Sequence, residues 1–174
     1  PGITLSYQEP SYNHTTSKHG ELFDFGIEYQ PNIAIKEEMT TKKYVFIRAL
    51  NRFADKFPLF RNKLTSMRLD YDKIWGRIIS KHPIDGKMIP GAFVDWDNTP
   101  RHQNRGSFCL GVSPEKFENY LTKQLKRTKE VYNKDILFLF AWNEWGESGY
   151  LEPDEKNKYK MLEAIASALR ESEK

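Results

Sequence analysis

The sequence has one cysteine, no internal repeat and no low-complexity tract in its 174 residues. A lone Cys109 excludes a disulfide within the chain and is typical of a reducing compartment. The longest apolar run, "ILFLFAW", is far shorter than the roughly 20 residues that span a bilayer, and no signal peptide is visible. We therefore expect a cytoplasmic protein without a transmembrane segment, and leave peripheral contact with a bacterial membrane open.

Signals for several ligand classes are also lacking. The net charge is only +3, and the lysines are scattered among acidic residues, which indicates solvated helix faces rather than a nucleic-acid surface. The four histidines share no metal-ligand spacing, and there is no glycine-rich phosphate loop. We therefore expect no nucleic acid, no metal and no cofactor.

What the chain has instead is a large aromatic share, 14% of its residues, often beside acidic or amide side chains. Sugar-binding clefts have this character, because a pyranose offers an apolar CH face for stacking and a rim of hydroxyls for hydrogen bonds. Core packing explains any single aromatic residue equally well. The length suits one domain, residues 1–174, and the start at Pro1 without a methionine indicates a piece of a longer protein.

Strand and helix patterns alternate along the chain. Strands are predicted at 22–31, 87–97 and 135–142, and the last of these is apolar on both faces, as in a covered parallel strand. Helices are predicted at about 43–57, 71–80, from Ser113 onward and at 156–172. Ser113 should cap its helix. The last helix should bury Leu162, Ile165, Ala166 and Leu169.

This alternation predicts an α/β fold with parallel strands and flanking helices. Polar residues gather where the predicted strands end, at Glu28, Asp95, Asp97, Asn143 and Glu144. In a (β/α)₈ TIM-type barrel the carboxyl ends of the strands form the active face, and a whole barrel needs about 250 residues. We therefore expect the C-terminal half of such a barrel.

Two glutamates in "NEWGES" are the strongest candidates for chemistry. Glu144 and Glu147 follow a predicted buried strand, and Gly146 and Gly149 allow a tight turn that brings them to one side of a cleft. Two adjacent carboxyl groups cannot both ionise freely, so one of them can donate a proton, as glycosidic bond chemistry requires. The alternative is capping of the next helix, which we favour for Glu152, Asp154 and Glu155.

The stretch "AWNEWGESGYLEPD" closely resembles the signature of the WbsX-like glycosyltransferase group, which is similar to family 99 glycoside hydrolases. "PGAFVDWDNTPR" and "FDFGIEYQPN" also resemble segments of that group. The resemblance implies a TIM-barrel enzyme acting on a polysaccharide or lipid-linked glycan, often in lipopolysaccharide, O-antigen or capsule synthesis. Its substrates would be glycans, sugar nucleotides or lipid-linked sugars.

Family 99 hydrolases are retaining enzymes that use two glutamates in an E-W-x-E arrangement. Carried over, Glu144 would assist the sugar 2-hydroxyl through an anhydro-sugar intermediate, and Glu147 would act as acid and base. The group usually has glycine directly after the second acid, whereas this chain has Ser148 there. We expect further substrate contacts from residues at the strand ends: Trp142, Asn143, Trp145, Tyr150, Trp96, Asp97, Asn98, Arg101, Glu28 and Tyr29.

Two alternatives stay open at this point. Asp95-Trp96-Asp97 matches the D-x-D pattern with which metal-dependent nucleotide-sugar transferases hold a divalent cation, although the pattern is short and common. The chain also fits a glycan-binding module that kept the aromatic cleft but lost turnover. Whether an enzyme would hydrolyse or transfer is not decided by the sequence, because water or a sugar hydroxyl can enter at the same carboxylate pair.

Overall fold

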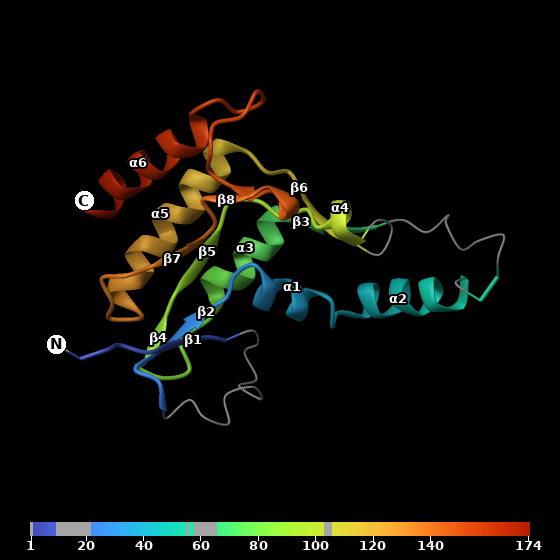
Figure 1. Ribbon diagram of the computed structural model, residues 1–174, viewed down its shortest axis with the longest axis horizontal. Helices are drawn as coiled ribbons and strands as arrows, with labels where there is room; N and C mark the ends of the chain where they lie inside the picture. Colours follow the sequence, from blue (N-terminus) through green and yellow to red (C-terminus); the bar gives the residue numbers. More distant parts are fainter. Residues whose placement is uncertain (1, 10–21, 55, 58–65, 103–105) are drawn as a thin grey trace.

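Short parallel strands lie against a layer of helices in the computed structural model, which describes residues 2–9, 22–54, 56–57, 66–102 and 106–174 (Figure 1). The helices are α1 (Asn32–Glu38), α2 (Lys42–Ala54), α3 (Tyr71–Ser80), α4 (Thr99–His102), α5 (Pro114–Glu130) and α6 (Lys160–Ser172). The strands are β1 (Ser6–Glu9), β2 (Phe25–Glu28), β3 (Met67–Asp70), β4 (Met88–Ile89), β5 (Gly91–Phe93), β6 (Ser107–Leu110), β7 (Phe138–Phe140), β8 (Asn143–Glu144) and β9 (Gly149–Tyr150).

The three strands expected from the sequence are parallel to one another. β1 pairs with β2 and β2 with β4, while β5 pairs with β7, all in parallel register. β4 and β5 follow each other directly in the chain on either side of Pro90, which has no N–H to donate to a ladder. The expected α/β arrangement is confirmed. The described strands nevertheless form four separate small sheets and do not close into a barrel.

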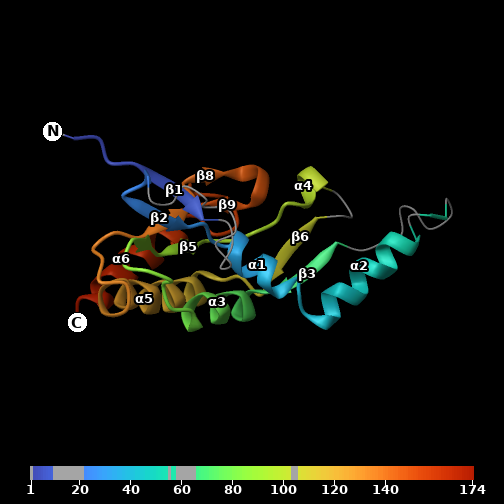
Figure 2. The ribbon, with the colours of Figure 1, turned by 90° about the horizontal axis from the view of Figure 1, so that it is seen from below.

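The helices α3, α5 and α6 lie together beneath the strands in Figure 2. Aromatic rings fill the contact between α3, α5 and β5: the Trp75 ring stacks on Phe93 at 5.2 Å and on Tyr120 at 5.4 Å between centroids. The Tyr71 hydroxyl donates to the Val94 carbonyl at 2.8 Å, so this buried polar atom is paired. The helix layer therefore fixes the position of residues 91–94. The loop that leads to Arg101 starts directly after them.

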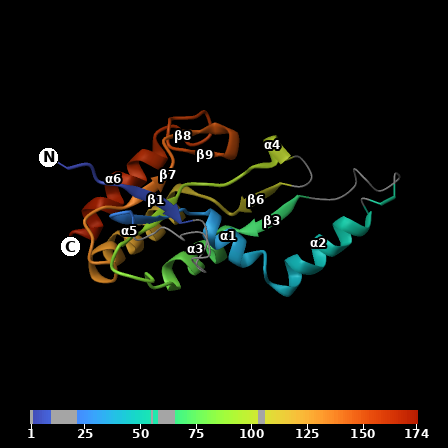
Figure 3. The same cartoon turned by 60° about the horizontal axis from the view of Figure 1, so that its bottom comes forward.

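The helices with good caps begin where the sequence predicts. Ser113 Oγ accepts from Lys116 N–H and caps α5, as expected. Asp70 caps α3 in the same way, accepting from Asp72 N–H and Lys73 N–H. In contrast, α2 buries little of its apolar face: Val45, Phe46, Leu50 and Phe53 are all exposed. Figure 3 shows α2 extending away from the strands.

Three expectations about the C-terminal third are wrong in whole or in part. β7 is only three residues long, and Ile136, Phe138 and Trp142 are exposed, because β5 is its one strand partner among the described residues. The helix expected from 156 begins at Lys160, because residues 154–158 form a turn closed by Lys158 N–H to Asp154 O. Its fully buried residues are Met161, Ala164 and Ala168. Of the four residues predicted to be buried, Leu162 and Ile165 are half-buried against the core, whereas Ala166 and Leu169 are exposed.

No helix in the described part of the chain is long and apolar enough to cross a membrane.

Candidate active site

Glu144 and Glu147 lie at the two ends of one tight turn. β8 pairs antiparallel with β9, Glu144 opposite Gly149, and a single 3₁₀ turn (Trp145–Glu147) joins them. Ser148 closes the turn in the left-handed region, with φ of 56°. At Gly149 a Cβ would lie 2.3 Å from Phe140 Cε1, so the hairpin can pack this closely on β7 only with glycine there. Position 148, where the resembling group usually has glycine, is the residue of this turn with positive φ.

A guanidinium joins the two carboxylates. Arg101 Nη2 lies 2.6 Å from Glu144 Oε1, and Arg101 Nη1 lies 3.0 Å from Glu147 Oε1. At Gly146 a Cβ would lie 2.7 Å from Arg101 Nη2, so the glycine leaves room for this approach. The positive charge offsets the repulsion that two neighbouring carboxylates would otherwise feel. The sequence places Arg101 among the substrate contacts, but does not predict that it binds both glutamates.

The segment before Arg101 is held by the two polar residues expected at the cleft rim. Asp97 Oδ1 accepts from the Thr99 backbone N–H at 2.9 Å and from its hydroxyl at 2.6 Å. Asn98 Oδ1 accepts from Ser107 N–H at 2.7 Å. The Asp97 N–H in turn donates to the Glu147 carbonyl at 2.8 Å, which ties this segment to the acidic turn. Asp97 and Asn98 therefore position Arg101 in this structure.

Tyr29 joins this cluster. Its ring meets Phe140 edge-on, with centroids 5.7 Å apart. Burial raises the pKa of the Tyr29 hydroxyl, and the negative charges of Glu147 and Glu144 raise it further, while Arg101 lowers it. A neutral phenol beside two carboxylates is a hydrogen-bond donor, which suits contact with an acidic or hydroxylated group.

Glu28 lies apart from the cluster. Its carboxyl group is buried, and Tyr132, just beyond α5, donates to Oε2 at 3.0 Å. Burial raises the pKa of Glu28 to about 7, against smaller opposing effects of the Tyr132 hydrogen bond and the Arg127 charge. Successive side chains along a strand point to opposite faces, so Glu28, the last residue of β2, does not share a face with the neighbouring Tyr29.

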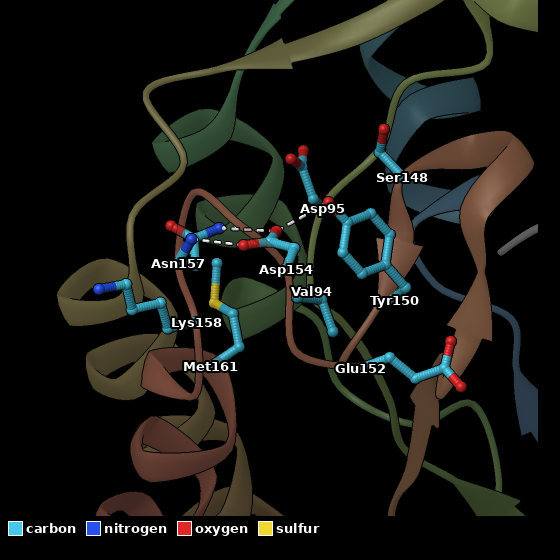
Figure 4. Close-up of a pocket in the computed structure, with 9 residues that line it drawn as sticks. All are labelled: Val94, Asp95, Ser148, Tyr150, Glu152, Asp154, Asn157, Lys158 and Met161. Atoms are coloured by element: carbon cyan, nitrogen blue, oxygen red, sulfur yellow. Dashed lines mark hydrogen bonds between the residues drawn. The ribbon is translucent and has the colours of Figure 1, made fainter.

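The two aspartates of the D-x-D pattern have different surroundings. Asp95 lines a cavity of about 20 Å³ together with Tyr150, Asp154, Asn157 and Lys158 (Figure 4). Burial raises its pKa to about 6, although Trp96 N–H donates to Oδ1 at 2.6 Å. Asp97 instead closes the turn at Thr99. No group of three or more His, Cys, Asp or Glu side chains that could hold a metal occurs among the described residues.

The aromatic residues expected around the site divide into two kinds. Trp96 is buried and donates from Nε1 to Ser107 Oγ at 3.0 Å, so it belongs to the core. Trp142 and Asn143 are exposed at the hairpin base. Trp145 stacks on Tyr150 with centroids 3.7 Å apart and an interplanar angle of 16°. Trp145 and Tyr150 are therefore the aromatic pair beside the carboxylates.

Acidic residues after the hairpin hold this aromatic pair in place. Trp145 Nε1 donates to Glu152 Oε2 at 2.5 Å, and the Tyr150 hydroxyl donates to Asp154 Oδ2 at 2.8 Å, as Figure 4 shows for the second. Burial and the Asp154 hydrogen bond raise the pKa of Tyr150 to about 12. The expectation that these acids serve the last helix is wrong, because α6 begins only at Lys160.

Comparison with known proteins agrees with the motifs. A family model described as "Glycosyltransferase WbsX" matches residues 2–165. Two curated relatives, both called "Uncharacterized protein WxcX", come from two strains of Xanthomonas campestris pv. campestris. They are 30% and 29% identical to this chain over 150 residues, which is 84% of the chain. The chain spans only 19% of the length of these relatives. No solved structure matches.

Proposed function

The chain belongs to the glycosyltransferase WbsX family, and from that premise we propose that it carries the catalytic pair of an enzyme that makes or breaks glycosidic bonds. The supporting observation is the arrangement of Glu144 and Glu147 on one guanidinium, that of Arg101, beside the stacked rings of Trp145 and Tyr150. Carboxyl groups supply the proton transfers of such reactions, and aromatic rings hold the apolar faces of sugars.

Glu147 is the acid and base in this proposal. It protonates the oxygen that leaves the sugar, and then takes a proton from the water or hydroxyl that enters. Glu144 accepts the proton of the sugar 2-hydroxyl, which attacks its own anomeric carbon. These roles follow the resemblance to family 99 hydrolases. The side chain of Glu147 is 15% exposed and that of Glu144 is 33% exposed, so both can be reached from solvent.

Arg101 positions the pair. Each ion pair uses Oε1, so one oxygen of each carboxylate is held while the sugar can approach the other. A guanidinium presents its donors in a rigid plane, so it keeps both carboxylates in a fixed relative orientation. Substrate positioning to within about 1 Å is worth on the order of 10²-fold in rate, which is the role that we assign to Arg101.

We also propose that the described strands are the C-terminal part of a TIM-type barrel. In support, the parallel order β1–β2–β4 and β5–β7 has helices on one face, and the acidic turn follows the carboxyl end of β7. The glycan substrate would be a polysaccharide or a lipid-linked sugar of lipopolysaccharide, O-antigen or capsule synthesis, handled at the cytoplasmic side of a bacterial membrane. This setting rests on the family resemblance alone.

A test of the proposal measures glycan binding and glycan turnover on one preparation of the protein, with and without a chelator. We expect turnover that survives chelation and that is lost in Glu144→Gln and Glu147→Gln. Binding without any turnover in the wild type would favour the alternative of a glycan-binding module. Turnover that requires Mg²⁺ or Mn²⁺ would favour the nucleotide-sugar transferase alternative at Asp95 and Asp97.

A further inference from the structure

An open groove lies on the side of the hairpin turned toward residues 153–159. Its volume is about 500 Å³, within the range of small-molecule sites. The groove shares Trp145 with the candidate active site, and its other lining residues lie between β9 and α6: Pro153, Asp154, Glu155, Lys158 and Tyr159. It is therefore continuous with the site, but it does not include Glu144 or Glu147.

The Trp145 ring is fixed in position before any ligand binds. One face stacks on Tyr150, and Nε1 donates to Glu152. The side chain remains 50% exposed, and it lines the groove whereas Tyr150 does not, so the groove lies on the ring's other side. A preorganised aromatic face binds a ligand with little loss of conformational entropy.

The rest of the groove combines apolar faces with a polar rim. Tyr159 is 63% exposed, and Pro153 contributes a second apolar ring. Asp154 is held by hydrogen bonds from Tyr150 and Asn157, so its carboxylate has a fixed place at the rim. Glu155 and Lys158 complete the rim. An apolar floor with two carboxylates and one ammonium group matches the apolar face and hydroxyl edge of a pyranose.

We propose that this groove is a subsite for one further pyranose unit of the glycan, next to the unit on which Glu144 and Glu147 act. The charge of the rim decides between this ligand and the nucleotide of a sugar donor. Asp154 and Glu155 accept hydrogen bonds from neutral hydroxyls, but they repel a diphosphate. The inference rests on the proposed function, since it assumes that the bound polymer passes the hairpin. In this inference Tyr159, Pro153 and Glu155 determine how long a glycan the protein binds, and they take no part in catalysis.

The experiment compares binding and turnover of linear manno-, gluco- and galacto-oligosaccharides from one to six units, in the wild type and in Tyr159→Ala. We expect affinity to rise with length in the wild type. Tyr159→Ala should weaken binding of the longer oligosaccharides roughly 5- to 20-fold, as expected for one lost aromatic contact, and leave the shortest bound glycan unchanged. Tyr159→Phe keeps the ring and should retain the wild-type length dependence.

Phe46→Ala is the matched control, because Phe46 is 64% exposed on α2, away from the hairpin, and should change nothing. The subsite is refuted if wild-type affinity does not rise with length for any series, or if Tyr159→Ala weakens short and long glycans equally. Length-dependent binding that needs Tyr159 but comes without turnover would refute the proposed enzyme and keep the subsite. Turnover in the wild type, with the same length dependence in Tyr159→Ala, would refute the subsite and keep the proposed enzyme.

Discussion

Two acidic regions at the ends of parallel strands have opposite environments in this protein. At Glu144 and Glu147 the carboxylates are partly open to solvent, and their charge is offset by Arg101. At Glu28 the carboxyl group is buried against Tyr132, and burial raises its pKa to about 7. The same residue type at the end of a strand is thus available for chemistry in one place and enclosed in the other. Position at a strand end is not enough to identify a catalytic acid, because register and partners decide its surroundings.

The largest difference between the regions should appear in turnover. Glu144→Gln and Glu147→Gln each remove a carboxylate that we place at the reacting sugar, and each should reduce turnover roughly 10²- to 10⁴-fold. Glu28→Gln should retain turnover, because its carboxyl group lies away from the cluster. Kinetic assays of the three variants on one glycan check this. Comparable losses in all three, with unchanged folding, would remove the distinction between the regions.

The second difference should appear in the pH dependence of stability. The folded-state pKa of Glu28 is raised from 4.5 to about 7, so the folded protein binds an extra proton between those values. The contribution of Glu28 to the free energy of unfolding should therefore be largest below pH 4.5, and it should fall as the pH rises to 7. The total change is about 3 kcal/mol at roughly 1.4 kcal/mol per pH unit.

Glu28→Gln should remove the Glu28 part of this slope, since a neutral amide does not titrate, and leave the smaller part that Asp95 contributes below pH 6, where burial also raises the pKa to about 6. Urea unfolding at pH 5 and pH 8 measures it, with Glu147→Gln as the comparison variant that keeps the slope. An equally steep decline in Glu28→Gln would show that another group carries the proton.

A third effect concerns the cation that distinguishes the open pair. Arg101→Lys keeps the charge but loses the planar fork that contacts Glu144 and Glu147 together. Turnover should fall roughly 10- to 100-fold, because the two carboxylates are no longer held in one orientation. Arg77→Lys is a matched control, since Arg77 pairs with Glu37 and Glu38 on α1, and should leave turnover unchanged. Wild-type rates in Arg101→Lys would mean that Arg101 forms only a surface ion pair and does not position the two carboxylates.

The smallest effect lies in the turn itself. Ser148 has φ of 56°, a conformation that costs a residue with a Cβ about 1–2 kcal/mol, part of which glycine loses again through its greater chain entropy. Ser148→Gly should therefore raise the free energy of unfolding by roughly 0.5–1 kcal/mol and leave turnover unchanged. Thermal unfolding and a rate assay check both. A destabilised variant would mean that the Ser148 side chain stabilises the turn.

The sequence predicts well where local chemistry decides the structure. Ser113 and Pro114 mark the start of α5, and the period of apolar residues gives α3 its bounds, because caps and amphipathic faces act within one element. It predicts less well where distant segments decide. β1, β3 and β6 are four-residue strands that depend on partners far along the chain, and the sequence pattern did not reveal them.

The candidate site follows the same division. The turn between Glu144 and Glu147 is predicted from Gly146 and Gly149, although its left-handed residue is Ser148 and the glycines instead make room for Arg101 and Phe140. The bridge from Arg101 spans more than 40 residues of chain and depends on where α4 lies against the hairpin. The burial of Glu28 depends on Tyr132, 104 residues away. No local pattern contains that information.

In the proposed reaction Glu147 donates the proton to the leaving oxygen, while Glu144 acts on the sugar itself. The most direct measurement compares turnover of two glycosides with the same sugar, one with a sugar leaving group and one with a nitrophenyl leaving group that needs little protonation. For Glu147→Gln we predict a loss of roughly 10²- to 10⁴-fold on the first and a loss of less than about 10-fold on the second. Glu144→Gln should slow both alike. Equal losses on both glycosides in Glu147→Gln would contradict the claim.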